Sequence, residues 1–130
     1  MSKFLTIAAV LGFVGVVFGA FGAHGLEDRL ISNGHLDTWQ TATFYLFVHV
    51  LALFVLATGL GDRISGSLCW IGWFWTVGIL IFSGSLYILA ITDLSKLGMI
   101  APFGGGCFLA GWGILAWFGY RNKRKSVENS

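Results

Sequence analysis

Charged residues are scarce in this chain, and their scarcity excludes most soluble folds. Asp, Glu, Lys and Arg make up 11% of the 130 residues, whereas a soluble domain has about 25%. Hydrophobic residues make up 56%, and the mean hydropathy is +0.80. With so few polar groups to coat a globule, lipid is the expected solvent of most side chains. The net charge of +2 is too small to predict a nucleic-acid partner.

Cysteines and acidic residues are also few, which argues against disulfide bonds, metal sites and common enzyme active sites. The two cysteines, Cys69 and Cys107, lie in apolar runs and form no CxxC pair, so neither a disulfide framework nor a zinc site is predicted. No Asp or Glu lies inside an apolar run, and neither a Ser-His-Asp arrangement nor a GxSxG motif is apparent. We therefore expect no enzymatic activity, no bound metal and no cofactor.

Four apolar runs are present, and each is long enough to cross the ~30 Å hydrocarbon core as a helix. They predict an all-α integral membrane protein, a four-transmembrane-helix bundle over residues 1–120 with spans at about 4–23, 38–60, 67–92 and 101–120. Residues 25–36 mix charged and apolar side chains and predict a short interfacial helix between the first two spans. Residues 121–130 are basic and polar and predict a disordered tail.

The first apolar run has a second interpretation, as a cleaved signal peptide. Lys3 precedes the run, and Ala20-Phe21-Gly22 resembles a cleavage site. However, the run is longer than the usual signal core of about 7–15 residues. It also carries small residues four apart, a pattern that serves packing against another helix and has no use in a discarded segment. We therefore expect a retained transmembrane helix.

Small residues at helical spacing predict close packing of helices throughout the chain. Three consecutive glycines in the first turns of the fourth span are unfavourable for an isolated helix, which indicates either tight backbone packing or a locally loosened helix. The glycines on the first and fourth spans would also permit a homo-oligomer. The predicted packing glycines are Gly12, Gly15, Gly19, Gly22, Gly84, Gly104, Gly105 and Gly106.

The distribution of basic residues predicts how the chain is oriented. Four spans place both termini on one side of the membrane, and six of the eight basic residues then share that side: Lys3, Arg63, Arg121, Lys123, Arg124 and Lys125. Only Arg29 and Lys96 lie opposite. Because cytoplasmic segments carry an excess of Lys and Arg, we expect both termini to be cytoplasmic.

Polar side chains inside the spans predict one candidate site in the outer half of the bundle. His49 and Ser83 each lie about nine residues from the outer end of their spans, so they share a depth of roughly 13 Å. Tyr45 and Tyr87 match in depth in the same way, and His24 lies at the outer end of the first span. The candidate polar cluster is therefore His24, Tyr45, His49, Ser83 and Tyr87.

Two interpretations of this cluster remain open. Histidine and hydroxyl groups at one depth could bind a small polar solute, relay protons or coordinate a metal. A metal is the least favoured of these, because two histidines without a carboxylate or thiolate fall short of a usual site. Alternatively, His49 bonds to Ser83 or to a carbonyl and holds helices together.

Several blocks of the sequence resemble one family of small bacterial membrane proteins. The blocks occur in order along the chain, at residues 19–26 (GAFGAHGL), 38–42 (TWQTA) with His49 downstream, 82–87 (FSGSLY), and 103–106 (FGGG) through 110–112 (AGW). They look like the YgdD/YwdK-type inner-membrane proteins, a group of unknown function with eukaryotic transmembrane relatives. The resemblance implies a multi-pass protein of four helices in a bacterial plasma membrane, and it implies no activity or site residues.

Two classes of function therefore remain. One is a helix-packing scaffold or assembly protein whose partners are membrane lipid and other membrane proteins, including a second copy of the chain. The other is a small binding or transport protein for a polar solute, a proton or a lipid headgroup, with no ligand identified. A conventional ion channel is not favoured, because four short helices in one chain leave little room for a pore.

Overall fold

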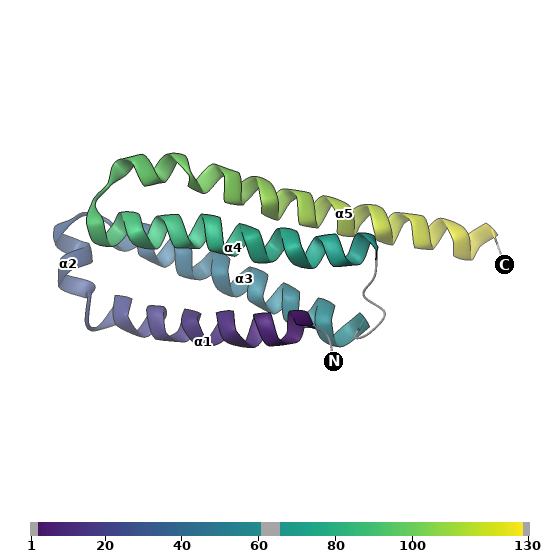
Figure 1. Cartoon of the computed structure of the whole chain (residues 1–130), viewed down its shortest axis with the longest axis horizontal. Coiled ribbons are helices and arrows are strands. Elements are labelled where there is room, and N and C mark those ends of the chain that lie inside the picture. Colours follow the sequence, from purple (N-terminus) through teal and green to yellow (C-terminus); the bar gives the residue numbers. More distant parts are fainter. Residues whose placement is uncertain (1–2, 61–65, 129–130) are drawn as a thin grey trace.

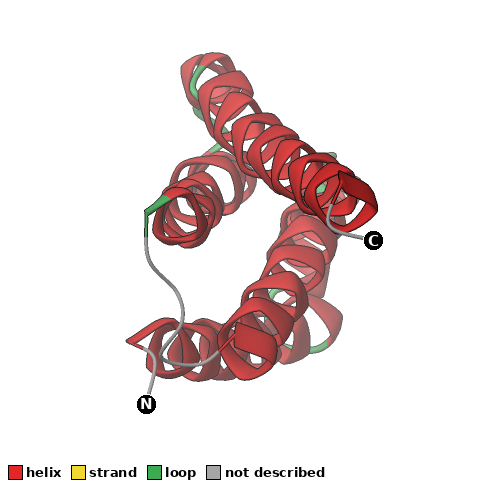
Figure 2. Ribbon diagram, turned by 90° about the vertical axis from the view of Figure 1, so that its right-hand side faces the viewer, coloured by secondary structure: helices red, strands yellow, loops and turns green. Residues whose placement is uncertain are grey.

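Every regular element in the computed structural model, which describes residues 3–60 and 66–128, is a helix (Figures 1 and 2). The long helices are α1 (Lys3–Ala23), α3 (Leu36–Leu60), α4 (Ser67–Thr92) and α5 (Ala101–Glu128). Two short helices join them, α2 (Glu27–Ser32) and the 3₁₀ helix η2 (Ser95–Met99). Because lipid offers no partners for backbone N–H and C=O groups, an apolar run in a membrane satisfies them internally as a helix.

All four long helices are apolar and long enough to cross a membrane. The first three begin within two residues of the predicted spans, at residues 3, 36 and 67, and end at residues 23, 60 and 92. The outer faces remain strongly apolar, since Phe13, Phe103 and Leu109 are each more than 70% exposed. Such faces suit lipid as their surroundings. The chain is therefore a multi-pass membrane protein with four spans.

The basic tail differs from its prediction. Residues 121–128, expected to be disordered, continue α5 as a helix to Glu128. Arg124 Nε lies 3.2 Å from the Glu128 carboxylate one turn later, and the Ser126 hydroxyl donates to the carbonyl of Lys123. These local contacts extend the helix beyond the apolar segment. Residues 129–130 and Arg63 lie outside the described residues.

The long helices pack in series. α1 packs against α3, α3 against α4, and α4 against α5, whereas α1 and α5 are not a closely packed pair in the part of the chain that the structure describes. α4 is the central helix, because half of its most apolar segment is buried compared with 17% for α1. Large side chains such as Leu53, Ile71 and Ile79 fill the core between α3 and α4.

The first residues of α1 and the last residues of α5 lie at the same end of the bundle (Figure 1). We call this the terminal end. At the opposite end, α2 lies across the direction of the long helices (Figure 1). We call this the loop end, because it also holds η2. A view along the bundle from the terminal end shows α5 at the outside (Figure 2).

Glycines receive large side chains from neighbouring helices. A Cβ at Gly15 would collide with Leu46, and a Cβ at Gly22 would collide with the Trp39 indole. Gly104 has the closest approach to the main chain of another helix, because an added Cβ would meet the backbone of Phe82 on α4. Gly12 and Gly19 are in ordinary contact range of α3. Three further glycines, which the sequence did not single out, receive aromatic rings: Gly72, Gly78 and Gly111.

The packing role predicted for Gly84, Gly105 and Gly106 is wrong within a single chain. A Cβ at any of these positions would meet no described atom within 4 Å. Gly84 and Gly105 are partly buried and Gly106 is exposed, but each has space for a side chain, so small size is not what packing inside this chain requires there. Spacing along a helix identified the glycine-rich segments but not which of their glycines face a neighbour.

Candidate functional site

His49 of α3 is buried and bridges to α5. Its Nδ1 lies 2.8 Å from the carbonyl oxygen of Tyr45, and its Nε2 lies 3.1 Å from the indole nitrogen of Trp112. A carbonyl only accepts a hydrogen bond and an indole N–H only donates one. Nδ1 therefore carries the proton and Nε2 accepts, which is the neutral ring with both nitrogens occupied. The ring also stacks on Phe108 of α5, with centroids 3.5 Å apart.

Ser83 and Tyr87 of α4 turn towards a different part of α3. The Ser83 hydroxyl donates to the carbonyl of Ala42 over 2.8 Å. The Tyr87 hydroxyl lies 2.8 Å from Oγ1 of Thr43, which itself donates to the carbonyl of Trp39. Tyr87 is therefore the donor in its bond to Thr43. Both α4 side chains are buried, and both are used to hold α4 against α3.

The connection continues from α3 to α1. Nε1 of Trp39 donates to the carbonyl of Phe18 over 3.0 Å, while the indole ring rests on Gly22. The ring of Phe18 lies edge-on to that of Tyr87, with centroids 4.8 Å apart. A path of hydrogen bonds and ring contacts thus runs from α4 through α3 to α1 near the loop end.

The predicted cluster is not a single site. The structure brings Tyr45 next to His49, whose rings are parallel with centroids 6.2 Å apart, but directs Ser83 and Tyr87 to the backbone and Thr43 of α3. His24 is exposed at the end of α1, and its backbone N–H continues the helix by donating to Ala20. The predicted equal depth of His49 and Ser83 is wrong: Ser83 contacts α3 at Ala42, seven residues before His49, and the His49 ring lies near Trp75, eight residues before Ser83 on α4.

Trp112 and Thr43 are the partners that sequence reasoning missed. Trp112 lies eleven residues after Ala101, the first residue of α5, and His49 lies thirteen after Leu36, the first of α3. The same depth count that linked His49 to Ser83 would therefore have placed Trp112 beside it. An indole N–H at mid-span, which needs an acceptor when buried, is the signal that could have identified it.

A second polar arrangement lies at the loop end, where α2 and the following turn contact the last turn of α4. Arg29 Nε donates to the carbonyl of Ile91 over 3.2 Å, and Asn33 Nδ2 donates to that of Ala90 over 3.3 Å. The ring of His35 lies 2.6 Å from the Asp93 carboxylate. The last carbonyls of a helix lack partners within it and carry partial negative charge. These side chains supply the missing donors.

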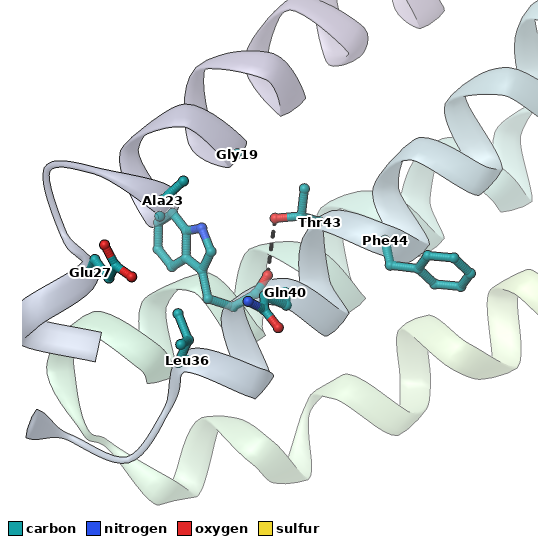
Figure 3. A pocket seen from close by; sticks show the side chains of 9 residues that line it. Gly19, Ala23, Glu27, Leu36, Gln40, Thr43 and Phe44 are labelled. Atoms are coloured by element: carbon teal, nitrogen blue, oxygen red, sulfur yellow. Dashed lines mark hydrogen bonds between the residues drawn. The ribbon is translucent and has the colours of Figure 1, made fainter. Parts of the chain in front are cut away.

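A cavity of about 430 Å³ opens between α1, α2 and α3 near this end. Figure 3 shows Glu27, Gln40 and Thr43 around it, together with the apolar residues Leu36 and Phe44. None of the five residues of the predicted cluster lines this cavity. Within residues 3–60 and 66–128, no three His, Cys, Asp or Glu side chains come together as a metal site would require.

Comparison with known proteins gives a family for the chain. A family model described as "Protein of unknown function (DUF423)" matches residues 18–105. The chain is 45% identical over 114 residues to the UPF0382 membrane protein YwdK of Bacillus subtilis, covering 86% of this chain and 91% of that one. It is 40% identical over 129 residues to the UPF0382 inner membrane protein YgdD of Escherichia coli K12, covering 98% of each. No solved structure matches. The resemblance predicted from the sequence blocks is confirmed.

Proposed function

Because the chain belongs to the DUF423 family, whose members include the UPF0382 membrane proteins, we propose that it is a helix-packing scaffold or accessory protein of the bacterial inner membrane. In this proposal it has no substrate and acts by presenting the outer faces of its helices to other membrane components. Both termini are cytoplasmic, and α2 lies in the opposite membrane interface.

One observation carries the proposal. The buried residues of the predicted cluster are bonded to a neighbouring helix or to their own helix backbone: His49 to Tyr45 and Trp112, Ser83 to Ala42, and Tyr87 to Thr43. Among the described residues, the indole nitrogen of Trp75 on α4 is a buried side-chain donor without a partner. A polar group that serves a solute or a proton path must have a free lone pair or proton directed into an accessible space. Committed groups of this kind favour a structural role, in which each interhelical bond contributes about 0.6 kcal/mol.

The outer faces supply the surfaces that such a role requires. Gly105 and Gly106 of α5 have open space where a Cβ would lie, and the neighbouring Phe103 and Leu109 are exposed. Small residues of this kind on an open helix face let the backbone of another helix approach closely. This favours association with another membrane helix, either from a second copy of the chain or from a different protein.

A second candidate function is supported by the 430 Å³ cavity between α1, α2 and α3. It presents the Glu27 carboxylate and the Gln40 amide beside an apolar wall. Glu27 has no ion-pair partner among the described residues. A small polar or cationic solute would fit these groups better than it would fit the predicted His/Tyr/Ser cluster.

The test separates the two candidates by comparing the folded amount of each variant with its ability to restore the abundance of other membrane proteins. Loss of a scaffold lowers the abundance of the membrane proteins that depend on it, which quantitative proteomics of membranes from a deletion strain would detect. We expect Ser83→Ala and Thr43→Val to restore that abundance in proportion to their own folded amount. Glu27→Gln and its matched control Asp28→Asn should both restore it fully, because neither carboxylate contributes to helix packing.

A contrary result is equally specific. If Glu27→Gln is present in the membrane at the wild-type amount but fails to restore the proteome, while Asp28→Asn succeeds, the scaffold proposal is wrong. Solute binding at the cavity would then replace it.

A further inference from the structure

Two cavities adjoin towards the terminal end, between residues 67–74 of α4 and residues 110–125 of α5. The smaller has a volume of about 220 Å³ and is lined on one side by Arg121, Asn122 and Lys125. The larger has a volume of about 470 Å³ and extends along the apolar parts of both helices. They share Ser67, Ile114 and Trp117 in their linings, so the two cavities are adjacent.

The smaller cavity has the chemistry of an anion site. Arg121 and Lys125 are four residues apart on α5 and therefore lie on one face of it. Among the described residues neither has an ion-pair partner, whereas Arg124 pairs with Glu128 at 3.2 Å. Guanidinium and ammonium groups, with the Asn122 amide beside them, are donors suited to the oxygens of a phosphate.

The larger cavity has the chemistry of an acyl-chain groove. Its walls are Trp70 and Phe74 on α4 and Ala110 and Gly113 on α5. A Cβ at Gly113 would meet no described atom within 4 Å, so glycine leaves this space unfilled by the protein. Trp117 lies where the two cavities meet, and tryptophan is the residue typical of the level of lipid headgroups.

We propose that this pair of cavities binds one anionic phospholipid, with its phosphate between Arg121 and Lys125 and one acyl chain along Ala110 and Gly113. A free phosphate or nucleotide would account for the cationic cavity but not for the apolar groove joined to it. A second copy of the chain would bring the same basic terminal end against this one, and like charges repel. Only an amphiphile with a negative head matches both halves.

The experiment uses the full chain, purified in a mild detergent and titrated with phosphatidylglycerol, with bound lipid counted by native mass spectrometry. We expect one phosphatidylglycerol to be retained per chain, and phosphatidylcholine to bind more weakly. Removing both charges in the double variant Arg121→Gln/Lys125→Gln should weaken phosphatidylglycerol binding on the order of 30-fold, because each basic residue near an anionic surface contributes a factor of about five.

The matched control removes the same number of charges from the same helix segment. Lys123→Gln/Arg124→Gln should leave binding within about twofold of wild type, since neither residue lines either cavity. Equal losses in the two double variants would mean that the tail attracts lipid only through its total charge, and would overturn the proposal.

The apolar half is tested separately. Gly113→Leu should fill the groove and abolish retention of the lipid, whereas Gly119→Leu, another open position on α5, should not. Retention by Gly113→Leu would show that no acyl chain lies in the groove. Competition on the unaltered protein completes the test. Glycerol phosphate, which has the head without the chains, should displace the lipid only at a large excess, and displacement at equal concentration would identify a soluble phosphate as the ligand instead.

Discussion

At the scale of single residues, His49 is hydrogen-bonded on one side to an acceptor and on the other side to a donor. The Tyr45 carbonyl can only accept a hydrogen bond and the Trp112 indole can only donate one, so a side chain between them must do both. A neutral histidine meets this requirement with its two ring nitrogens. An aliphatic replacement would leave the N–H of Trp112, a side chain that is 42% exposed at the outer face of the bundle, without its acceptor in apolar surroundings. An unpaired polar group there costs about 1–3 kcal/mol.

We therefore expect His49→Leu to lower the free energy of unfolding in detergent by about 1–3 kcal/mol. Trp112→Phe removes the donor while keeping an aromatic ring. In the double variant the shared hydrogen bond is lost only once, so its destabilisation should be smaller than the sum of the two single effects, by about 0.6 kcal/mol or more. Strict additivity of the two substitutions would show that the bond contributes nothing.

What could be predicted about these residues was only an approximate depth. The rise per residue converts sequence position into depth and predicted one layer for His49 and Ser83, but Ser83 contacts α3 seven residues before His49, at Ala42. It did not give the direction in which each side chain points, because the rotation of a helix about its axis is set by how all the helices pack. Ser83 faces the carbonyl of Ala42 and His49 faces Trp112. The cluster predicted from depth alone is therefore two separate sets of contacts, one between His49 and α5 and one between α4 and α3.

At the scale of elements, glycine determines how closely two helices approach. Within one turn, α5 has a glycine in close contact with another helix and a glycine that faces open space. Gly104 lies against the backbone of Phe82 in α4, whereas Gly106 faces open space. A methyl group at residue 104 would press on main-chain atoms, which cannot move aside as the tip of a side chain can. The same group at residue 106 meets nothing in the chain.

Alanine substitutions at these two glycines should consequently have opposite effects. We expect Gly104→Ala to destabilise the protein by about 1–3 kcal/mol through overpacking. Gly106→Ala should be neutral, or stabilising by up to about 1 kcal/mol, because alanine favours the helix. Denaturant titration followed by circular dichroism would measure both. Equal stability of the two variants is incompatible with close packing of α4 and α5 at Gly104.

The helix ends show why hydropathy predicts some boundaries and misses others. An apolar run ends where the chain meets water, and this located the end of α4 at Thr92. It carries no information about whether a polar segment beyond the membrane stays helical. In α5 the contacts between Arg124 and Glu128 and between Ser126 and Lys123 continue the helix, although the composition resembles that of a disordered tail.

At the scale of the whole molecule, charge is divided between the two ends of the bundle. Lys3 and the four basic residues of α5 are at the terminal end. The loop end holds Arg29 and Lys96 together with most of the acidic residues, which are Glu27, Asp28, Asp37 and Asp93. Since short cytoplasmic segments carry the excess of Lys and Arg, this division favours a cytoplasmic terminal end.

Reporter fusions would test this orientation. A reporter that is active only in the cytoplasm should be active when it follows Ser130 or precedes residue 1, and inactive when inserted at Gly34 in the turn after α2. Replacing the basic residues of the tail by glutamine while adding lysines at the loop end should increase the inverted population. Reporter activity at Gly34 in the unaltered chain would mean that the protein has the opposite orientation to the one predicted from its charges.

The serial packing of the long helices also bears on how the protein is made. Each closely packed pair, α1 with α3, α3 with α4 and α4 with α5, consists of successive spans. As synthesis proceeds from the N-terminus, every new span therefore finds its main neighbour already in the bilayer, and no early span waits for a late one. Some contacts described above join spans that are not successive: the ring contact of Phe18 with Tyr87 forms once α4 is inserted, and the bond from Trp112 to His49 forms only after α5 is inserted. Insertion of α5 therefore completes the hydrogen bonds of a side chain that entered the bilayer two spans earlier.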